Sequence, residues 1–246
     1  MTAERSMATE AKDPSRFTVP LYTLSEAARA LDVPPATFAT WAKGYVRRPP
    51  GRRPVKGAPI VTALTNGSGG PTVPFVGLAE GMVLAAVRRV GVPMQRVRPA
   101  LDVLARDIGL KHALASKALY TDGAELLFDY ARQGRGEPAE AARELVVVRS
   151  GQRVFTEVIE RYLQLIEYGT DGYARLIRLP AYERAEVVVD PMRSFGQPIF
   201  KRGGTRVADV LALFWAGDPI ETLAAEFGVP ATEIEDVLRA ASRRAA

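Results

Sequence analysis

The sequence predicts a mainly α-helical protein with small β elements, divided into two domains. Apolar residues recur at helical spacing along most of the 246-residue chain, and runs typical of strands are short and few. The hydrophobic fraction of 47% and the charged fraction of 25% are ordinary for a folded chain that buries a core. We therefore expect an N-terminal winged helix-turn-helix domain and a small C-terminal α+β domain ending in a three-helix, helix-turn-helix-like bundle.

The domain boundaries follow from composition. The first 16 residues alternate charged and small polar groups, which is typical of a disordered tail. The segment GRGEPAEAARE is polar, contains two glycines and one proline, and lies between apolar-periodic segments, as a linker does. The expected parts are a tail (1–16), a helix-turn-helix domain with a helical extension (17–133), a linker (134–144) and a C-terminal domain (145–246).

Two short helices open the first domain. Leu24 to Leu31 has apolar residues on one face and Ser25 available as an N-cap. The second predicted helix covers Pro35 to Lys43, because proline suits the first turn and Gly44 suits the end of a helix. The short break between them gives the pair the proportions of a helix-turn-helix.

The predicted wing follows an arginine- and proline-rich stretch that we expect to be irregular. Ile60 to Leu64 and Thr72 to Val76 have the composition of paired strands, and the glycine-rich segment between them is typical of a hairpin turn. Further helices of this domain are expected at Leu78 to Val90, Met94 to Ile108 and Ala124 to Arg132, the last capped by Asp122.

The second domain mixes short strands and helices. Phe155 to Glu167 has one apolar stripe and predicts an amphipathic helix. Asp218 and Pro219 predict the N-cap and first turn of a later helix. The expected strands are Leu145 to Arg149, Arg175 to Leu179 and Glu186 to Val189, and the other helices are Thr205 to Ala216, Ile220 to Phe227 and Ala231 to Arg243.

The positive charge is concentrated in the front half. Residues 17–133 contain 15 Lys and Arg against 8 Asp and Glu, whereas residues 134–246 contain 15 against 17. An excess of positive charge favours a phosphate-bearing partner such as nucleic acid. A generic basic surface without a nucleic-acid partner is the alternative.

The second helix of the pair predicts a DNA-reading surface. Burial of Phe38 and Trp41 would leave Thr37, Thr40 and Lys43 on the outer face, where small side chains can approach base edges in a major groove. The cations expected to hold phosphates are Arg47, Arg48, Arg52, Arg53 and Lys56. Two packed helices without a ligand, followed by a solvated charged loop, remain the alternative.

Recognisable catalytic patterns do not occur in the sequence. It has no cysteine and a single histidine, His112, which we expect at the surface near a helix end. Acidic residues such as Glu233 and Asp236 are interpreted as ordinary helix surface. Signal-peptide, membrane-spanning and phosphate-loop patterns are missing. We expect a cytoplasmic protein that is not an enzyme and has no metal or cofactor.

Residues Val187 to Ala241 resemble a small bacterial domain, long catalogued as of unknown function, that is found in antitoxins. Tyr22 to Gly44 is similar to the helix-turn-helix of MerR-type proteins. The combination resembles the two-domain VapB-like antitoxins of actinobacteria. The C-terminal motifs are Asp190-Pro191, Phe195-Gly196-Gln197-Pro198, Gly203-Gly204-Thr205-Arg206, Gly217-Asp218 and Glu226-Phe227-Gly228-Val229.

This resemblance implies a partner and a regulatory role. The partner would be a PIN-type ribonuclease toxin, and the chain, as a homodimer, would bind double-stranded DNA of its own operator and repress its own operon. Antitoxins of this kind often block the toxin's metal site with basic side chains. By charge, the candidates for that contact are Arg239, Arg243 and Arg244.

Two other functions stay open from the sequence. The helices could bind a toxin without ever contacting DNA. Alternatively, the chain could be a MerR-like transcriptional regulator that senses a small ligand, which would require an apolar pocket with a few polar groups in the C-terminal domain.

Overall fold

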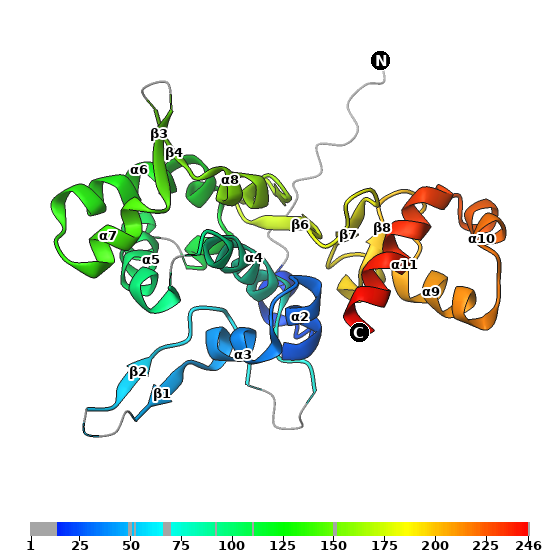
Figure 1. Ribbon diagram of the computed structural model, residues 1–246, viewed down its shortest axis with the longest axis horizontal. Coiled ribbons are helices and arrows are strands. Elements are labelled where there is room, and N and C mark those ends of the chain that lie inside the picture. Colours follow the sequence, from blue (N-terminus) through cyan, green and yellow to red (C-terminus); the bar gives the residue numbers. More distant parts are fainter. Residues whose placement is uncertain are drawn as a thin grey trace, which may run out of the picture.

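The computed structural model describes residues 14–48, 51, 53–65, 70–91, 93–109, 111–149 and 152–245 (Figure 1). The helices are α1 Ser15–Thr18, α2 Leu24–Ala30, α3 Pro35–Lys43, α4 Phe75–Arg89, α5 Met94–Ile108, α6 Lys117–Gln133, α7 Glu137–Arg143, α8 Glu157–Leu163, α9 Val207–Ala216, α10 Ile220–Phe227 and α11 Ala231–Ala245. The strands are β1 Tyr45–Arg47, β2 Val55–Gly57, β3 Val146–Arg149, β4 Gln152–Phe155, β5 Ile166–Tyr168, β6 Ala174–Arg178, β7 Val187–Val189 and β8 Ile199–Phe200.

Helix α4 lies at the centre of the N-terminal part. Every residue from Phe75 to Val87 is buried, because α1, α8 and β6 all pack against this helix. At Gly81, a Cβ atom would lie 2.6 Å from the Phe38 ring and 2.9 Å from Leu31. The absence of a side chain at Gly81 therefore lets the α2–α3 pair approach the backbone of α4 closely.

The predicted tail is partly wrong. Residues 1–13 lie outside the described part of the chain, but residues 14–16 belong to the folded structure. The Arg16 guanidinium forms an ion pair with Asp171 and donates a hydrogen bond to the Ala174 carbonyl at 2.8 Å. Phe17 then packs edge-on against Tyr173, with ring centroids 5.3 Å apart. A buried, paired guanidinium is inconsistent with a free tail.

The hairpin forms earlier in the chain than predicted. Strands β1 and β2 pair antiparallel and flank the arginine- and proline-rich turn, with Val46 opposite Lys56. The segment predicted to be the wing instead wraps around the helix pair. The amides of Ile60 and Val61 donate to the Trp41 carbonyl at 2.8 and 3.2 Å, and the Val73 amide donates to Tyr22 at 2.9 Å. Residues 66–69 lie outside the described part.

The predicted linker contains helix α7. Ala139, Ala141 and Ala142 are buried where α7 packs against α5 and α6. Small apolar residues spaced along a charged sequence explain this packing, because the alanines face inward and the charged residues face solvent. The buried side chains on both sides of α7 belong to one contiguous cluster. The division of the chain into two domains at this point stays a prediction.

Two predicted helix boundaries before the C-terminal sheet are wrong. Helix α6 begins at Lys117, with the Ser116 hydroxyl accepting from the Leu119 amide, so Asp122 lies inside the helix rather than at its cap. The predicted helix from Phe155 to Glu167 is shorter, since Phe155 ends β4 and Glu167 belongs to β5. Its apolar stripe is shared between α8 and the two flanking strands.

Strands β5 to β8 form an antiparallel sheet in sequence order. Val187, Val188 and Val189 of β7 are all buried, which fits a strand near the middle of the sheet. Helices α9, α10 and α11 follow the sheet and form one end of the molecule, at the right in Figure 1. Leu223, Ile234 and their buried neighbours fill the space between these helices.

Asp236 is an internal anchor rather than ordinary helix surface. Its side chain is fully buried, and its Oδ2 accepts hydrogen bonds from the amides of Arg184 at 2.8 Å and Ala185 at 3.0 Å. Burial acts to raise the pKa of this carboxyl, but the amide hydrogen bonds outweigh burial and lower it. At α10 the N-cap is Pro219, without a side-chain hydrogen bond, so the prediction of Asp218 as cap is wrong.

Gly81→Ala should destabilise the fold. Helix propensity alone predicts a gain of about 1 kcal/mol from Gly to Ala, but the added methyl group collides with buried side chains and costs about 1–3 kcal/mol. We expect urea denaturation to show a lower free energy of unfolding. In a double-mutant cycle, Phe38→Leu should partly relieve the clash. A more stable Gly81→Ala protein would contradict the close packing of the helix pair on α4.

Asp236→Ala should lower the free energy of unfolding by about 2–3 kcal/mol, because it leaves buried amides without an acceptor. Since folding lowers the pKa of Asp236, its contribution is present above the ordinary aspartate pKa of about 3.9 and is lost as the pH falls below it. Urea denaturation between pH 7 and pH 3 measures both effects. The exposed neighbour changed in Glu235→Ala is the control, and equal losses in the two variants would contradict the anchor.

Candidate nucleic-acid interface

The first helix of the pair is fixed by its N-terminal cap. The Thr23 hydroxyl accepts from the Glu26 amide at 3.2 Å, and a Glu26 carboxylate oxygen accepts from the Thr23 amide at 2.8 Å. Hydrogen bonds from the Thr23 amide and hydroxyl lower the pKa of Glu26. This capping box replaces the predicted Ser25 cap, which lies one residue inside the helix. Its signal in the sequence is threonine followed three residues later by glutamate.

The turn into α3 is tight. Asp32 adopts φ of 54°, in the left-handed region, and the Val33 amide donates to the Ala28 carbonyl at 3.0 Å. Val33 is buried, as predicted for a residue that the turn carries inward. Asp32 also pairs with Arg89 of α4, the guanidinium nitrogen and carboxylate oxygen being 2.8 Å apart. Both side chains are largely exposed, so this pair contributes little to stability.

Helix α3 has the predicted bounds and the predicted division of faces. Phe38 and Trp41 are buried, with ring centroids 6.1 Å apart. Thr37 and Thr40 are half-buried on the outer side, and Lys43 is exposed. The Thr40 hydroxyl donates to the Ala36 carbonyl at 2.8 Å, so its methyl group and oxygen lone pairs are what it can offer a ligand. The outer face of α3 is polar, small and accessible.

The β1–β2 hairpin is anchored at its base by α5. The Arg98 side chain, 8% exposed, donates to the Ala58 carbonyl, and its guanidinium carbon lies 5.6 Å from the centroid of the Tyr45 ring. Gly57 lies so close under the Tyr45 ring that no Cβ atom would fit there. The base of the hairpin is thus held by a buried cation, which the sequence analysis did not identify.

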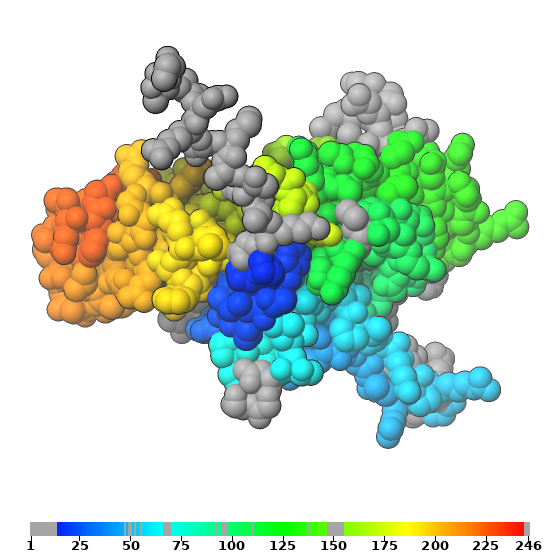
Figure 2. Space-filling view, turned by 180° about the vertical axis from the view of Figure 1, so that it is seen from behind, coloured from blue at the N-terminus to red at the C-terminus, as the bar shows by residue number. Residues whose placement is uncertain are grey.

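The hairpin carries the predicted phosphate-binding cations away from the body of the protein. Arg48, Arg53 and Lys56 are exposed, and the first two lie beyond the paired strands, in the turn. Arg47 lies in β1, but its side chain and the whole of Arg52 are outside the described residues. Figure 2 shows the hairpin, in light blue, projecting from the side of the molecule opposite α9 and α10.

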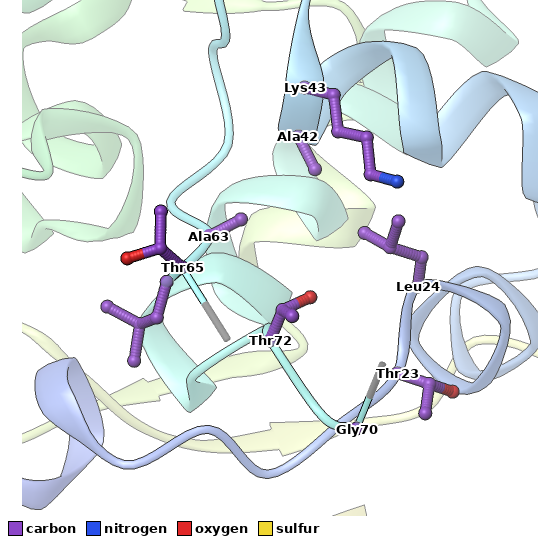
Figure 3. Close-up of a pocket in the computed structure, with 9 residues that line it drawn as sticks. Thr23, Leu24, Ala42, Lys43, Ala63, Thr65, Gly70 and Thr72 are labelled. Atoms are coloured by element: carbon purple, nitrogen blue, oxygen red, sulfur yellow. The ribbon is translucent and has the colours of Figure 1, made fainter. Parts of the chain in front are cut away.

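A pocket of about 520 Å³ lies between the start of α2, the end of α3 and the segment after the hairpin (Figure 3). Lys43 extends over this pocket from α3, with Leu24 across from it, while Ala63, Thr65 and Thr72 line the other sides. Lys43, three residues after Thr40, therefore stands where the outer face of α3 meets this pocket. A cation in that place is better suited to a phosphate than to a base.

The segment that lines this pocket is held on α4 by a buried carboxylate. Glu80 accepts from the Thr62 amide at 2.6 Å and from the Thr62 hydroxyl at 3.1 Å. The Nδ1 atom of His112 lies 3.1 Å from Glu80 and 2.9 Å from the Thr62 hydroxyl. His112 is only 12% exposed, so the prediction of a surface position is wrong. The signal for Glu80 was a lone carboxylate within the apolar sequence of α4.

The cations proposed for the toxin lie at the end of α11. Arg239 and Arg243 are four residues apart and exposed, so they share one face of the helix. Arg239 also lies 3.5 Å from the Asp236 carboxylate, so part of its charge is balanced within the chain. The Arg244 side chain lies outside the described part.

The described residues give no sign of a metal centre or of a membrane-spanning helix. In this part of the chain, no group of three or more histidine, cysteine or acidic side chains lies close enough together to hold a metal ion. Among the described helices, none combines the length and the apolar composition that crossing a membrane requires.

Comparison with known proteins agrees with this arrangement. A family model described as "Putative DNA-binding HTH domain" matches residues 20–101, and a model described as "Protein of unknown function (DUF433)" matches residues 187–240. The "Putative antitoxin VapB45" of Mycobacterium tuberculosis is 53% identical over 228 residues, which are 92% of this chain and 95% of that protein. The uncharacterized protein Rv2308 of the same organism is 27% identical over 89% of this chain and 88% of its own length.

A solved structure supports the fold over nearly the whole chain. The crystal structure of Rv2018 from Mycobacterium tuberculosis aligns with a TM-score of 0.80 and 50% identity, covering 91% of this chain and 99% of that one. These matches confirm the resemblance to VapB-like antitoxins that the sequence motifs indicated. The chain belongs to the VapB45 antitoxin family, with a helix-turn-helix domain near its N-terminus and a DUF433 region near its C-terminus.

Proposed function

We propose that this chain is a DNA-binding antitoxin that represses its own operon and neutralises a PIN-type ribonuclease toxin by direct binding. The observation that carries the DNA-binding part is the accessible, polar outer face of α3 next to an anchored, cation-bearing hairpin. Both are fixed to the same body of helices, the first through Gly81 and the second through Arg98. A rigid surface of this kind suits one face of a DNA duplex.

On this proposal α3 enters the major groove. Thr37 and Thr40 face base edges through their methyl groups and hydroxyl oxygens, and the Thr40 methyl group suits the methyl group of thymine. The hairpin lies along the neighbouring backbone as a wing, where Arg48, Arg53 and Lys56 meet phosphates. Lys43, at the edge of the helix, would join them in phosphate contact or reach the outermost base.

The proposed DNA-binding unit is a homodimer. A two-fold dimer presents two copies of α3 to half-sites one helical turn apart, about 34–36 Å, on a palindromic operator. The partner toxin is a PIN-type ribonuclease, for which the basic face of Arg239 and Arg243 on α11 is one candidate contact. Figure 1 places α9 to α11 and the β1–β2 hairpin at different ends of the molecule, so the two partners need not compete for one surface.

A gel shift with the DNA upstream of the chain's own gene tests the first part of the proposal, and co-purification with the neighbouring ribonuclease tests the second. Binding to the ribonuclease without any shift of the DNA would favour a toxin-binding module that does not contact DNA.

Removing hairpin cations should weaken binding to all DNA sequences. Each phosphate contact adds roughly 1 to the slope of the logarithm of affinity against the logarithm of salt concentration, so Arg48→Ala and Arg53→Ala should each reduce that slope by about 1. Fluorescence anisotropy at several salt concentrations measures it. Arg161→Ala, an equal charge change on the distant helix α8, should leave the slope unchanged. An unchanged slope in the Arg48→Ala/Arg53→Ala protein would remove the hairpin from the interface.

Changing the outer face of α3 should instead alter sequence preference. Thr40→Ala removes a methyl group and an acceptor without changing charge, so the salt slope should stay constant while discrimination at one base pair falls by about 1–3 kcal/mol. Binding-site selection from random DNA measures this preference. Thr222→Ala on the exposed face of α10 is the matched control. An identical selected sequence for wild type and Thr40→Ala would place Thr40 outside the major groove.

A further inference from the structure

The loop between β7 and β8 holds an unusual backbone conformation. Ser194, Phe195 and Gly196 follow one another with φ values of 48°, 52° and 72°. Glycine adopts this left-handed region readily, but serine and phenylalanine do so only at a cost. Such local strain persists only where the surroundings hold it in place, and it is concentrated at functional positions.

The strained loop presents two large apolar side chains to solvent. Phe195 is 87% exposed and Met192 is 71% exposed, more than any other large hydrophobic side chain in the described part of the chain. Neither side chain gains from burial within this chain. The loop therefore has an unfavourable backbone conformation, and it also leaves two large apolar side chains in contact with water.

Hydrogen bonds nevertheless fix the loop. The Met192 amide donates to Asp190 Oδ1 at 2.9 Å, and the Gly196 amide donates to the Arg193 carbonyl at the same distance. The Gly196 carbonyl accepts from the Tyr22 hydroxyl at 2.8 Å. Burial raises the pKa of Tyr22, so this hydroxyl stays protonated and remains a donor. These hydrogen bonds hold the turn that exposes Phe195 in one conformation.

Exposed cations lie on this loop and on the turn that follows β8. The Arg193 guanidinium packs on Gly204, in the space that a Cβ atom would occupy, so the loop lies beside the turn that follows β8. Lys201 and Arg202 are exposed in that turn, and the Lys201 ammonium lies 3.9 Å from a Glu167 carboxylate oxygen. The patch therefore combines two exposed apolar side chains with the exposed cations of the loop and of the neighbouring turn.

We propose that the Met192–Phe195 loop is the preorganised anchor by which this chain docks its ribonuclease toxin, an inference that rests on the proposed function. The matching surface on the toxin is an apolar pocket bordered by carboxylates. Rigid aromatic side chains with charged rims are typical of residues that dominate binding energy, and preorganisation lowers the entropy cost of docking. A second copy of the chain fits less well, because a two-fold contact through this loop would place the same cation-bearing surface on both sides of the interface.

The experiment measures binding of the full-length chain to the purified ribonuclease encoded beside its gene, by biolayer interferometry. Phe195→Ser should weaken affinity at least about 30-fold, mainly through faster dissociation. Lys201→Glu/Arg202→Glu should slow association and remove its salt dependence. Trp215→Ser, which changes another exposed aromatic residue 64% accessible on α9, is the matched control and should bind as wild type does. The gel shift with upstream DNA should be unchanged in Phe195→Ser.

The outcomes separate this inference from the function on which it rests. If the wild-type chain does not bind the ribonuclease, the proposed neutralisation fails and the anchor fails with it. If wild type binds and Phe195→Ser binds equally well, the anchor alone is wrong. Equal losses in Phe195→Ser and Trp215→Ser would also overturn it. Loss of the dimer in Phe195→Ser, measured by light scattering, would assign the loop to contact between copies, and loss of the gel shift would assign it to DNA.

Discussion

The structure depends on the close packing of the helix pair against α4. This helix is buried along nearly its whole length, and its glycine at position 81 receives the Phe38 ring while Glu80 holds the segment that follows the hairpin. Buried interfaces of this kind do not deform continuously, since interiors are close-packed. The outer face of α3 and the hairpin are consequently held in one fixed relation. Binding of a rigid, periodic ligand such as a DNA duplex requires that α3 and the hairpin keep this fixed arrangement.

The C-terminal part is joined to this body by specific polar contacts. Tyr22, which immediately precedes the α2 cap, donates to the Gly196 carbonyl of the strained loop, and Arg16 reaches the sheet through Asp171. Within the C-terminal part, Asp236 ties α11 to the segment before β7. These contacts place the Phe195 loop one hydrogen bond away from the start of the helix-turn-helix. The two proposed binding surfaces are therefore parts of one connected structure, although they face different partners.

Local patterns predicted most of the helices, and they predicted strands β3, β6 and β7 to within one residue, but they misplaced the β1–β2 hairpin. Apolar spacing and the proline and glycine at its ends were enough for α3, whose bounds were predicted correctly, because these features act within the helix itself. The hairpin was misplaced because pairing, not composition, decides where a short strand forms. Tyr45 and Gly57 pair at the base of the hairpin, which Arg98 contacts from α5. The structural roles of Glu80, Arg98 and Asp236 were not predicted for the same reason, because their hydrogen-bond partners are 18 or more residues away in sequence. Helical spacing alone was enough to predict which side chains of α3 face outward. The exposure of Phe195 depends on the backbone conformation of its loop, which helical spacing does not reveal.

Hydrogen–deuterium exchange of the free chain and of the chain bound to its own upstream DNA tests the central claim most directly. If α4 and α5 hold α3 and the hairpin as one rigid surface, bound DNA should slow exchange together in α3 and in the two hairpin strands, while α8, which packs on α4, stays unchanged. Protection confined to α9 through α11, or protection of α3 without the hairpin, would contradict the account.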